Sequence, residues 1–77
     1  GEYNALIVVQ KDKPGVVAHI TKILSDRGVN IAFMRLFREE KGHTAYTIVE
    51  SDERLPAGVD ALLLENPNIT DVMVVQP

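Results

Sequence analysis

The chain has 77 residues, a net charge of −3 and no cysteine, which leaves room for one domain and excludes disulfides and cysteine-bound metals. A pI near 5.2 and the lack of a basic stripe make the chain poorly suited to phosphate backbones, so we expect no nucleic-acid partner. The longest apolar runs are far too short to cross a membrane and no secretory signal is visible, so we expect a cytoplasmic chain without membrane contact.

Small size also bears on assembly. A domain of this length buries only about 60% of the surface of its unfolded chain, so good packing and self-association are its remaining routes to stability. Apolar residues make up 45% of the chain, which is enough for a core. We therefore expect a homodimer. Because the chain starts with Gly1 rather than Met, we also expect residues 1–77 to be one domain excised from a larger protein.

The first half of the chain predicts a strand, a turn and a helix. Residues 3–10 (YNALIVVQ) are apolar on both pleat faces along most of their length, which is typical of a central strand. Pro14 and Gly15 interrupt this pattern and predict a turn. Residues 16–28 then repeat apolar side chains at helical spacing, and Gly28 suits a left-handed C-cap.

The second half predicts two strands, a helix and a last strand. Residues 30–38 and 43–51 are strand-like, and the polar segment between them, with Gly42 near its end, indicates a hairpin. We expect a second helix with Pro56 in its first turn, followed by a strand over residues 68–76.

This order predicts an α+β fold. Two right-handed crossovers joined by a hairpin make a ferredoxin-like βαββαβ sandwich, a four-stranded antiparallel sheet with two helices on one face. The other face of the sheet and one edge then stay uncovered. Residues 30–38 carry large apolar side chains on both faces, so we expect this strand to pair with or pack on another subunit.

Residue types for catalysis are sparse. The chain has no glycine-rich phosphate loop, and no Ser/His/Asp grouping can be identified around its two histidines, His19 and His43. We interpret His43 and the pair Glu39-Glu40 as solvated groups. An acylphosphatase-like enzyme on this fold needs an arginine where the segment KDKPG offers only lysines. We therefore predict no catalytic residue, no metal and no cofactor in this chain.

One group of residues has the chemistry of a ligand site. Asp12, Pro14 and Gly15 form the turn into the first helix, whose N-terminal N–H groups attract a carboxylate. The carboxylate of Asp12 could receive an ammonium group, and the amide of Asn30, in the turn out of the helix, both donates and accepts. His19 would form a wall of the pocket. The structural alternative is that Asp12 caps the helix and Asn30 stabilises a turn.

Asp12 and Asn30 fall at opposite ends of the predicted helix, too far apart to share a small ligand within one subunit. If two subunits met antiparallel through their second strands, Asn30 of one would lie near Asp12 of the other. We therefore predict a site between two subunits.

The segment KDKPGVVAHITKILSDRGVNIAFMRL resembles the signature of ACT domains, in which a D/N-x-P-G turn precedes a helix and G-V-N-I opens the second strand. The resemblance covers Leu6 to Val75. It implies a regulatory module that binds an amino acid at a dimer interface and is attached to an enzyme of amino-acid metabolism. The positions assigned to the ligand site are Gln10, Asp12, Pro14, Gly15, Val16, His19, Asn30 and Ile31.

The stretches YNALIVVQKDKPGVVAHI and MRLFREEKGHTAYTIVESDE resemble the C-terminal ACT domain of the β subunit of bacterial iron–sulfur L-serine dehydratase. This resemblance implies L-serine as ligand and a catalytic domain or α subunit as partner. Enzymes of that type convert L-serine to pyruvate and ammonia with a [4Fe–4S] cluster, in serine metabolism and gluconeogenesis. This chain has no thiolate to hold such a cluster.

Two alternatives stay open. The chain could be a structural dimerisation module without a ligand, or the ACT domain of another enzyme such as 3-phosphoglycerate dehydrogenase. In the serine-binding ACT domains of that enzyme an Asn stands at the position of Asp12 and a His at the position of Gln10. This sequence therefore departs from that pattern at two ligand positions.

Overall fold

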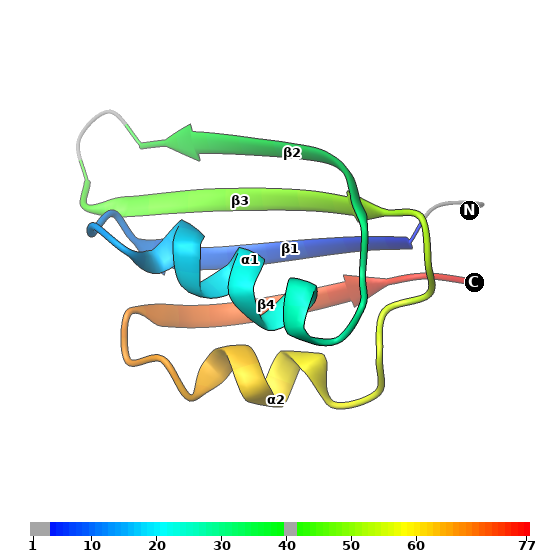
Figure 1. Cartoon of the computed structure of the whole chain (residues 1–77). Coiled ribbons are helices and arrows are strands. Elements are labelled where there is room, and N and C mark those ends of the chain that lie inside the picture. Colours follow the sequence, from blue (N-terminus) through cyan, green and yellow to red (C-terminus); the bar gives the residue numbers. More distant parts are fainter. Residues whose placement is uncertain (1–3, 40–41) are drawn as a thin grey trace.

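The computed structural model describes residues 4–39 and 42–77 and contains six elements in the order βαββαβ (Figure 1). The elements are β1 (Asn4–Lys11), α1 (Val16–Asp26), β2 (Ile31–Arg38), β3 (Thr44–Ser51), α2 (Val59–Leu64) and β4 (Ile69–Val75). The strands form one antiparallel sheet in the order β2-β3-β1-β4, and both helices lie on the same face of it. This arrangement confirms the predicted ferredoxin-like sandwich and the central position of β1. Within the described ranges, no helix is long and apolar enough to span a membrane.

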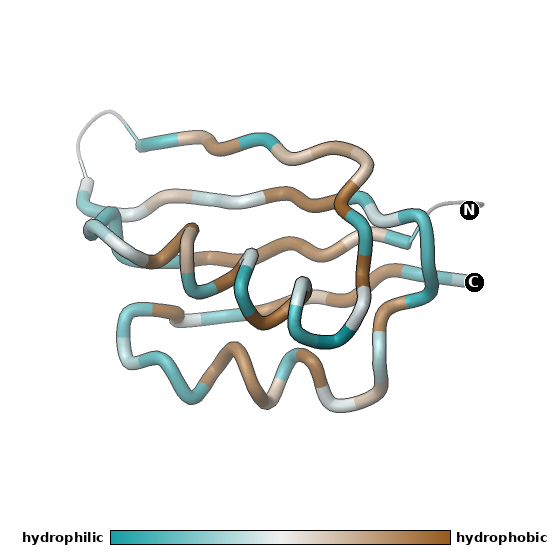
Figure 2. Tube along the Cα trace, viewed as in Figure 1, coloured by the Kyte–Doolittle hydropathy of each residue, from teal (hydrophilic) through white to brown (hydrophobic). Residues whose placement is uncertain are grey.

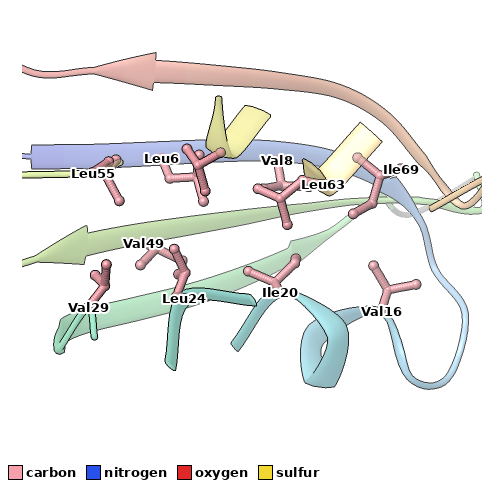
Figure 3. Close-up of a cluster of buried hydrophobic side chains, with 11 residues drawn as sticks. Leu6, Val8, Val16, Ile20, Leu24, Val29, Val49, Leu55, Leu63 and Ile69 are labelled. Atoms are coloured by element: carbon pink, nitrogen blue, oxygen red, sulfur yellow. The ribbon is translucent and has the colours of Figure 1, made fainter. Parts of the chain in front are cut away.

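Alternation along the two central strands builds the core. Leu6 and Val8 of β1 and Val49 of β3 are fully buried under the helices, whereas the residues between them are only half-buried on the other face. The buried cluster shared by the sheet, the helices and the loops consists of Leu6, Val8, Val16, Ile20, Leu24, Val29, Val49, Leu55, Val59, Leu63 and Ile69 (Figure 3). The core therefore occupies one side of the sheet only.

The C-terminus of α1 is closed as the sequence predicted. Gly28 has a φ of +74°, in the left-handed region that glycine tolerates. Its N–H donates to the carbonyl of Ser25 (3.0 Å), and the N–H of Val29 donates to the carbonyl of Leu24 (3.0 Å). These two bonds form a Schellman cap, and the apolar residues Val29 and Leu24 both lie in the core. The cap directs the chain back toward the sheet, where β2 begins.

The expectation that Pro56 lies in the first turn of the second helix is wrong. Gly58 has a φ of +82°, which is incompatible with a right-handed helix, so α2 begins only at Val59. Pro56 lies upstream, in a turn closed by a hydrogen bond from the N–H of Val59 to the carbonyl of Pro56 (3.3 Å). The resulting helix has 6 residues.

β2 forms one edge of the sheet and is almost entirely exposed. Four of its five large apolar side chains keep between 37% and 48% of their surface accessible, namely Phe33, Met34, Leu36 and Phe37. Figure 2 shows hydrophobic residues along β2 as well as along the central strands. A free edge that carries apolar side chains is a template for pairing with another chain.

Leu63 and Leu64 are neighbours in α2, but Leu63 is fully buried and Leu64 is 44% exposed. We expect Leu63→Ala to lower the free energy of unfolding by about 2–5 kcal/mol, because the substitution leaves a cavity in the core. Leu64→Ala, the matched control, should change it by less than about 0.5 kcal/mol. Urea denaturation followed by circular dichroism measures both values. Equal effects of the two substitutions would contradict the packing of α2.

Candidate functional site

The turn between β1 and α1 is fixed to the end of the sheet by backbone hydrogen bonds. The N–H of Asp12 donates to the carbonyl of His43 (2.5 Å), which ties the turn to the residue that precedes β3. The N–H of Lys13 donates to the carbonyl of Lys11 (2.8 Å). Gly15 ends the turn with a φ of +86° and is the N-cap of α1. Asp12 therefore lies at the same end of the sheet as the first turn of α1.

The first turn of α1 presents backbone N–H groups that no side chain caps in the described part of the chain. Gly15 has no side chain to offer, and its carbonyl accepts a hydrogen bond from the N–H of His19 (3.0 Å). The side chain of Val16 is buried in the core, so this predicted site residue can offer a ligand only its backbone. The partial positive charge of the uncapped N–H groups makes this turn suitable for a carboxylate.

Asp12 does not cap the helix, because its Oδ2 lies 2.9 Å from Nε of Arg38. The sequence did not indicate Arg38, since the last residue of β2 reaches Asp12 only across the end of the intervening β3. The side chains of Asp12 and Arg38 are 37% and 66% exposed, and a pair so well solvated contributes at most about 1 kcal/mol. A ligand ammonium group can therefore join or replace the guanidinium at this carboxylate.

A hollow of about 520 Å³ lies beside the turn and is lined by Lys11, Asp12, Lys13, His43, Thr44 and Thr70. Residues from the end of β1, the start of β3 and the start of β4 meet there. The two lysines flank Asp12 in the sequence, but the threonines come together only through the sheet register, in which Thr44 pairs with Lys11. The lining thus consists of two lysines, two threonines, one histidine and one aspartate. Within residues 4–39 and 42–77, no three His, Asp or Glu side chains gather closely enough to hold a metal ion.

Gln10 and His19 lie beside the turn and have different surroundings. Gln10 is buried, and its Oε1 accepts a 2.7 Å hydrogen bond from the hydroxyl of Thr47. The side-chain oxygen of Gln10 is therefore already bonded inside the protein. His19 is half-buried on α1, and its Nε2 is buried with no hydrogen-bond partner among the described residues. His19 therefore has a buried polar atom that no described residue uses.

Asn30 and Ile31 lie at the far end of α1. The helix has 11 residues and is about 16 Å long, so it separates Asn30 from Asp12 within one subunit. The backbone of Asn30 is fixed by its N–H, which donates to Oε1 of Glu53 (2.8 Å), and by its carbonyl, which accepts from the N–H of Asp52 (3.1 Å). Its side chain is exposed, whereas Ile31 packs against the core. The structure thus brings the predicted site residues together in two groups, one at each end of α1.

The chain matches a known protein family and is similar in sequence to two named proteins. A family model described as "ACT domain" matches residues 4–66. D-3-phosphoglycerate dehydrogenase of Methanocaldococcus jannaschii is 35% identical over 69 residues, which are 90% of this chain and 13% of that protein. The probable L-serine dehydratase, beta chain, of Bacillus subtilis strain 168 is 29% identical over 72 residues, 94% of this chain and 33% of that protein.

The fold recurs in a solved structure as well. The crystal structure of a formyltetrahydrofolate deformylase from Pseudomonas putida KT2440 matches with a TM-score of 0.81 at 18% identity, over 99% of this chain and 29% of that one. The chain thus spans about a third or less of the length of these three proteins. The residues that the family model matches include both the turn with Asp12 and the turn with Asn30.

The buried hydrogen bond between Thr47 and Gln10 generates a stability prediction. Thr47→Val keeps the shape of the side chain but leaves the amide of Gln10 without its partner in the interior. We expect the free energy of unfolding to fall by about 1–3 kcal/mol. Thr70→Val is the matched control, because the hydroxyl of Thr70 also donates a hydrogen bond, to the carbonyl of Val9 (3.0 Å), but is exposed to water. Chemical denaturation should show a clearly smaller effect for Thr70→Val, and equal losses would contradict the structural role of Gln10.

Proposed function

The chain belongs to the ACT domain family, and from this premise we propose that it is a regulatory module that binds a small free amino acid, L-serine. The observation that carries the proposal is the turn between β1 and α1, where the carboxylate of Asp12 and the uncapped N-terminus of α1 lie at the same end of the sheet. The N–H groups suit the carboxylate of an amino acid, and Asp12 suits its ammonium group. Both charges of a zwitterion have a partner at this turn.

The choice of L-serine rests on the relatives and on the lining of the hollow. One relative is named as an L-serine dehydratase beta chain. Thr44 and Thr70 line the hollow beside Asp12, and their hydroxyl groups can bond to a small hydroxylated side chain. A larger apolar side chain would offer no polar partner to the hydroxyl of Thr44, whereas the hydroxyl of Thr70 already donates to the carbonyl of Val9.

We further propose that two subunits pair through β2. The N–H of Glu39 donates to the carbonyl of Thr44 (3.0 Å), just beyond the last registered pair of β2 and β3. In an antiparallel pair such bonds alternate, so Arg35 and Phe37 direct their N–H groups toward β3. Leu36 and Met34 then direct theirs toward the free edge, where a second β2 can bond to them.

This pairing would bring the two groups of site residues together. If the twofold axis passes at Met34, near the middle of β2, so that the two Met34 residues face each other, Arg38 lies opposite Asn30 of the partner subunit. Arg38 contacts Asp12, so Asn30 of the partner subunit comes to the Asp12 end of the first subunit. The exposed amide of Asn30 can then complete the site around the ligand.

Regulation follows from this geometry. A ligand held by two subunits stabilises the arrangement that brings them together, and any part of the protein that responds to that arrangement responds to the ligand. We propose a catalytic domain or α subunit of an L-serine dehydratase as that part. The lyase reaction and the iron–sulfur cluster would belong there, whereas this chain would hold no cofactor. We expect the protein in the cytoplasm.

A dimerisation module without a ligand is the second candidate function. The contact between Arg38 and Asp12 favours it, because an internal cation already lies at the carboxylate that the ligand needs. This candidate keeps the pairing through β2 but implies no response to amino acids. A ligand titration therefore separates the two functions.

L-serine should raise the melting temperature of the chain. At a hundred times its dissociation constant, a ligand stabilises the folded state by about 2.7 kcal/mol. For a domain of this size that is a rise of roughly 10 °C or more. Differential scanning calorimetry with L-serine, and with D-serine as control ligand, measures the shift. The absence of any shift with L-serine would refute the ligand and favour the dimerisation module.

Substitutions at the two ends of α1 then locate the ligand. Asp12→Asn and Asn30→Ala should each weaken the affinity for L-serine at least tenfold, because each removes one polar anchor. Asp60→Asn changes an exposed carboxylate in the first turn of α2 and is the matched control. Isothermal titration calorimetry gives the affinities. An unchanged affinity of Asn30→Ala would remove Asn30 from the site.

The pairing of β2 has its own test. Leu36→Pro removes an N–H that points to the free edge and leaves the bonds to β3 intact, so we expect dimers to dissociate into monomers. Leu36→Ala removes a similar apolar surface but keeps the N–H, and should still dimerise. Sedimentation equilibrium measures both masses. A Leu36→Pro variant that stays dimeric would show that the subunits meet elsewhere.

A further inference from the structure

The face of the sheet turned away from α1 and α2, here named the open face, is not covered by any described part of the chain (Figure 1). We propose that the open faces of two β2-paired dimers stack on each other, so that four copies of the chain assemble. The proposal goes beyond amino-acid binding and rests on the β2 pairing proposed above.

The sheet register places apolar side chains of all four strands on the open face. Side chains that pair directly across strands share a face. Arg35 of β2 pairs with Ile48, Ile48 with Ile7 and Ile7 with Met73, so one row crosses all four strands. Val72 and Val74 of β4 pack against the core. Met73 lies between them and points to the other side of the sheet, so this row lies on the open face.

The rows on either side continue the apolar surface. Phe33 and Val75 lie at the two ends of one neighbouring row and are 48% and 49% exposed, while Met73 in the middle row is 54% exposed. In the other row Phe37 pairs with Tyr46, and the guanidinium carbon of Arg35 lies 4.3 Å from the centroid of the Phe37 ring. A contiguous exposed surface of this kind marks an interaction site.

The area of the face indicates what covers it. Four strands spaced about 4.8 Å apart, each rising about 3.4 Å per residue over seven residue steps, present a flat footprint of roughly 450 Å². A standard protein interface takes about 800 Å² from each partner. Two subunits joined through β2 present a continuous eight-stranded face of roughly 900 Å². A β2-paired dimer, and not a single subunit, therefore has a face of sufficient size.

The charges on the open face favour a second copy over a partner of opposite charge. Lys11, Arg35, Glu39, Glu50 and Asp71 carry two positive and three negative charges, and Glu39 belongs to this face because its carboxylate accepts a hydrogen bond from the hydroxyl of Tyr46. The net charge of the face is thus only −1, so it repels a copy of itself only weakly. Lys11 and Glu50 lie at opposite ends of the sheet, because Glu50 pairs with Ala5. A twofold axis perpendicular to the strands would place the Lys11 end of one subunit over the Glu50 end of another.

Sedimentation equilibrium of matched variants tests the stacking. We expect the 77-residue chain to reach the mass of four copies as its concentration rises. Met73→Lys places a charge in the middle of the open face and should raise the dimer–tetramer dissociation constant at least tenfold. Leu64→Lys places the same charge on an exposed leucine of α2, on the helical side, and should leave the tetramer intact. A chain that stops at two copies, or a Met73→Lys variant that still forms four, would overturn the proposal.

A charge exchange tests the orientation. Glu50→Lys should weaken the tetramer by opposing Lys11 of the facing subunit, and adding Lys11→Glu should restore it. Failure of the second substitution to restore the mass would overturn the antiparallel stacking.

Two further measurements distinguish the stacking of open faces from the proposed amino-acid binding and from the pairing through β2. Met73→Lys should keep its melting shift with L-serine, since residue 73 is not among the residues assigned to the ligand. A normal shift in a chain that never exceeds two copies would refute the stacking and leave the proposed function standing. A Leu36→Pro variant that forms dimers, which Met73→Lys then abolishes, would place the primary contact on the open face and overturn the paired arrangement.

Discussion

The pairing of β1 with β3 on one side and with β4 on the other is the constraint on which the rest of the structure depends. This pairing places Leu6 and Val8 under the helices and brings Gln10 to Thr47 in the interior. It also determines where β1 ends, and hence where the turn that carries Asp12 stands against the start of β3. The hollow at this turn exists because three strands end or begin at the same edge of the sheet.

The same topology separates the polar groups of the candidate site into two sets, one at each end of α1. A helix that crosses back over the sheet must begin at one end and finish at the other, so the turns at its two termini cannot meet within one subunit. In this chain Asp12 lies at the first turn and Asn30 at the second. The exposed edge strand β2 lies between these two ends of the molecule, and a twofold axis through its middle exchanges them. In the proposed dimer, assembly and ligand recognition would both be consequences of this one arrangement.

Local patterns in the sequence were sufficient to predict most of the fold. The order of the six elements follows from hydrophobic spacing and from the turn residues between them, and the cap at Gly28 follows from the preference of glycine for a positive φ. The start of α2 was predicted too early, because Pro56 is compatible with a first helical turn while Gly58 two residues later is not. The choice between these two signals depends on how the loop packs.

Contacts between distant residues could not be predicted in this way. Gln10 and Thr47 are 37 positions apart, and their hydrogen bond depends on the register of two strands. Arg38 reaches Asp12 only after β3 has been placed between β1 and β2. Thr44 and Thr70 reach the hollow for the same reason. Residue types in one turn therefore indicated a candidate ligand site, while the residues around that turn were determined by the sheet.

The contact between Arg38 and Asp12 has a consequence for sensitivity. For the proposed ligand, Arg38 would be a competitor built into the chain, because its guanidinium already lies at the carboxylate of Asp12. The ammonium group of the ligand would have to displace this guanidinium, so the observed affinity would be lower than the intrinsic one. A pair worth about 1 kcal/mol raises the half-saturating concentration about fivefold. The arginine would thus raise the concentration of free amino acid at which the protein responds.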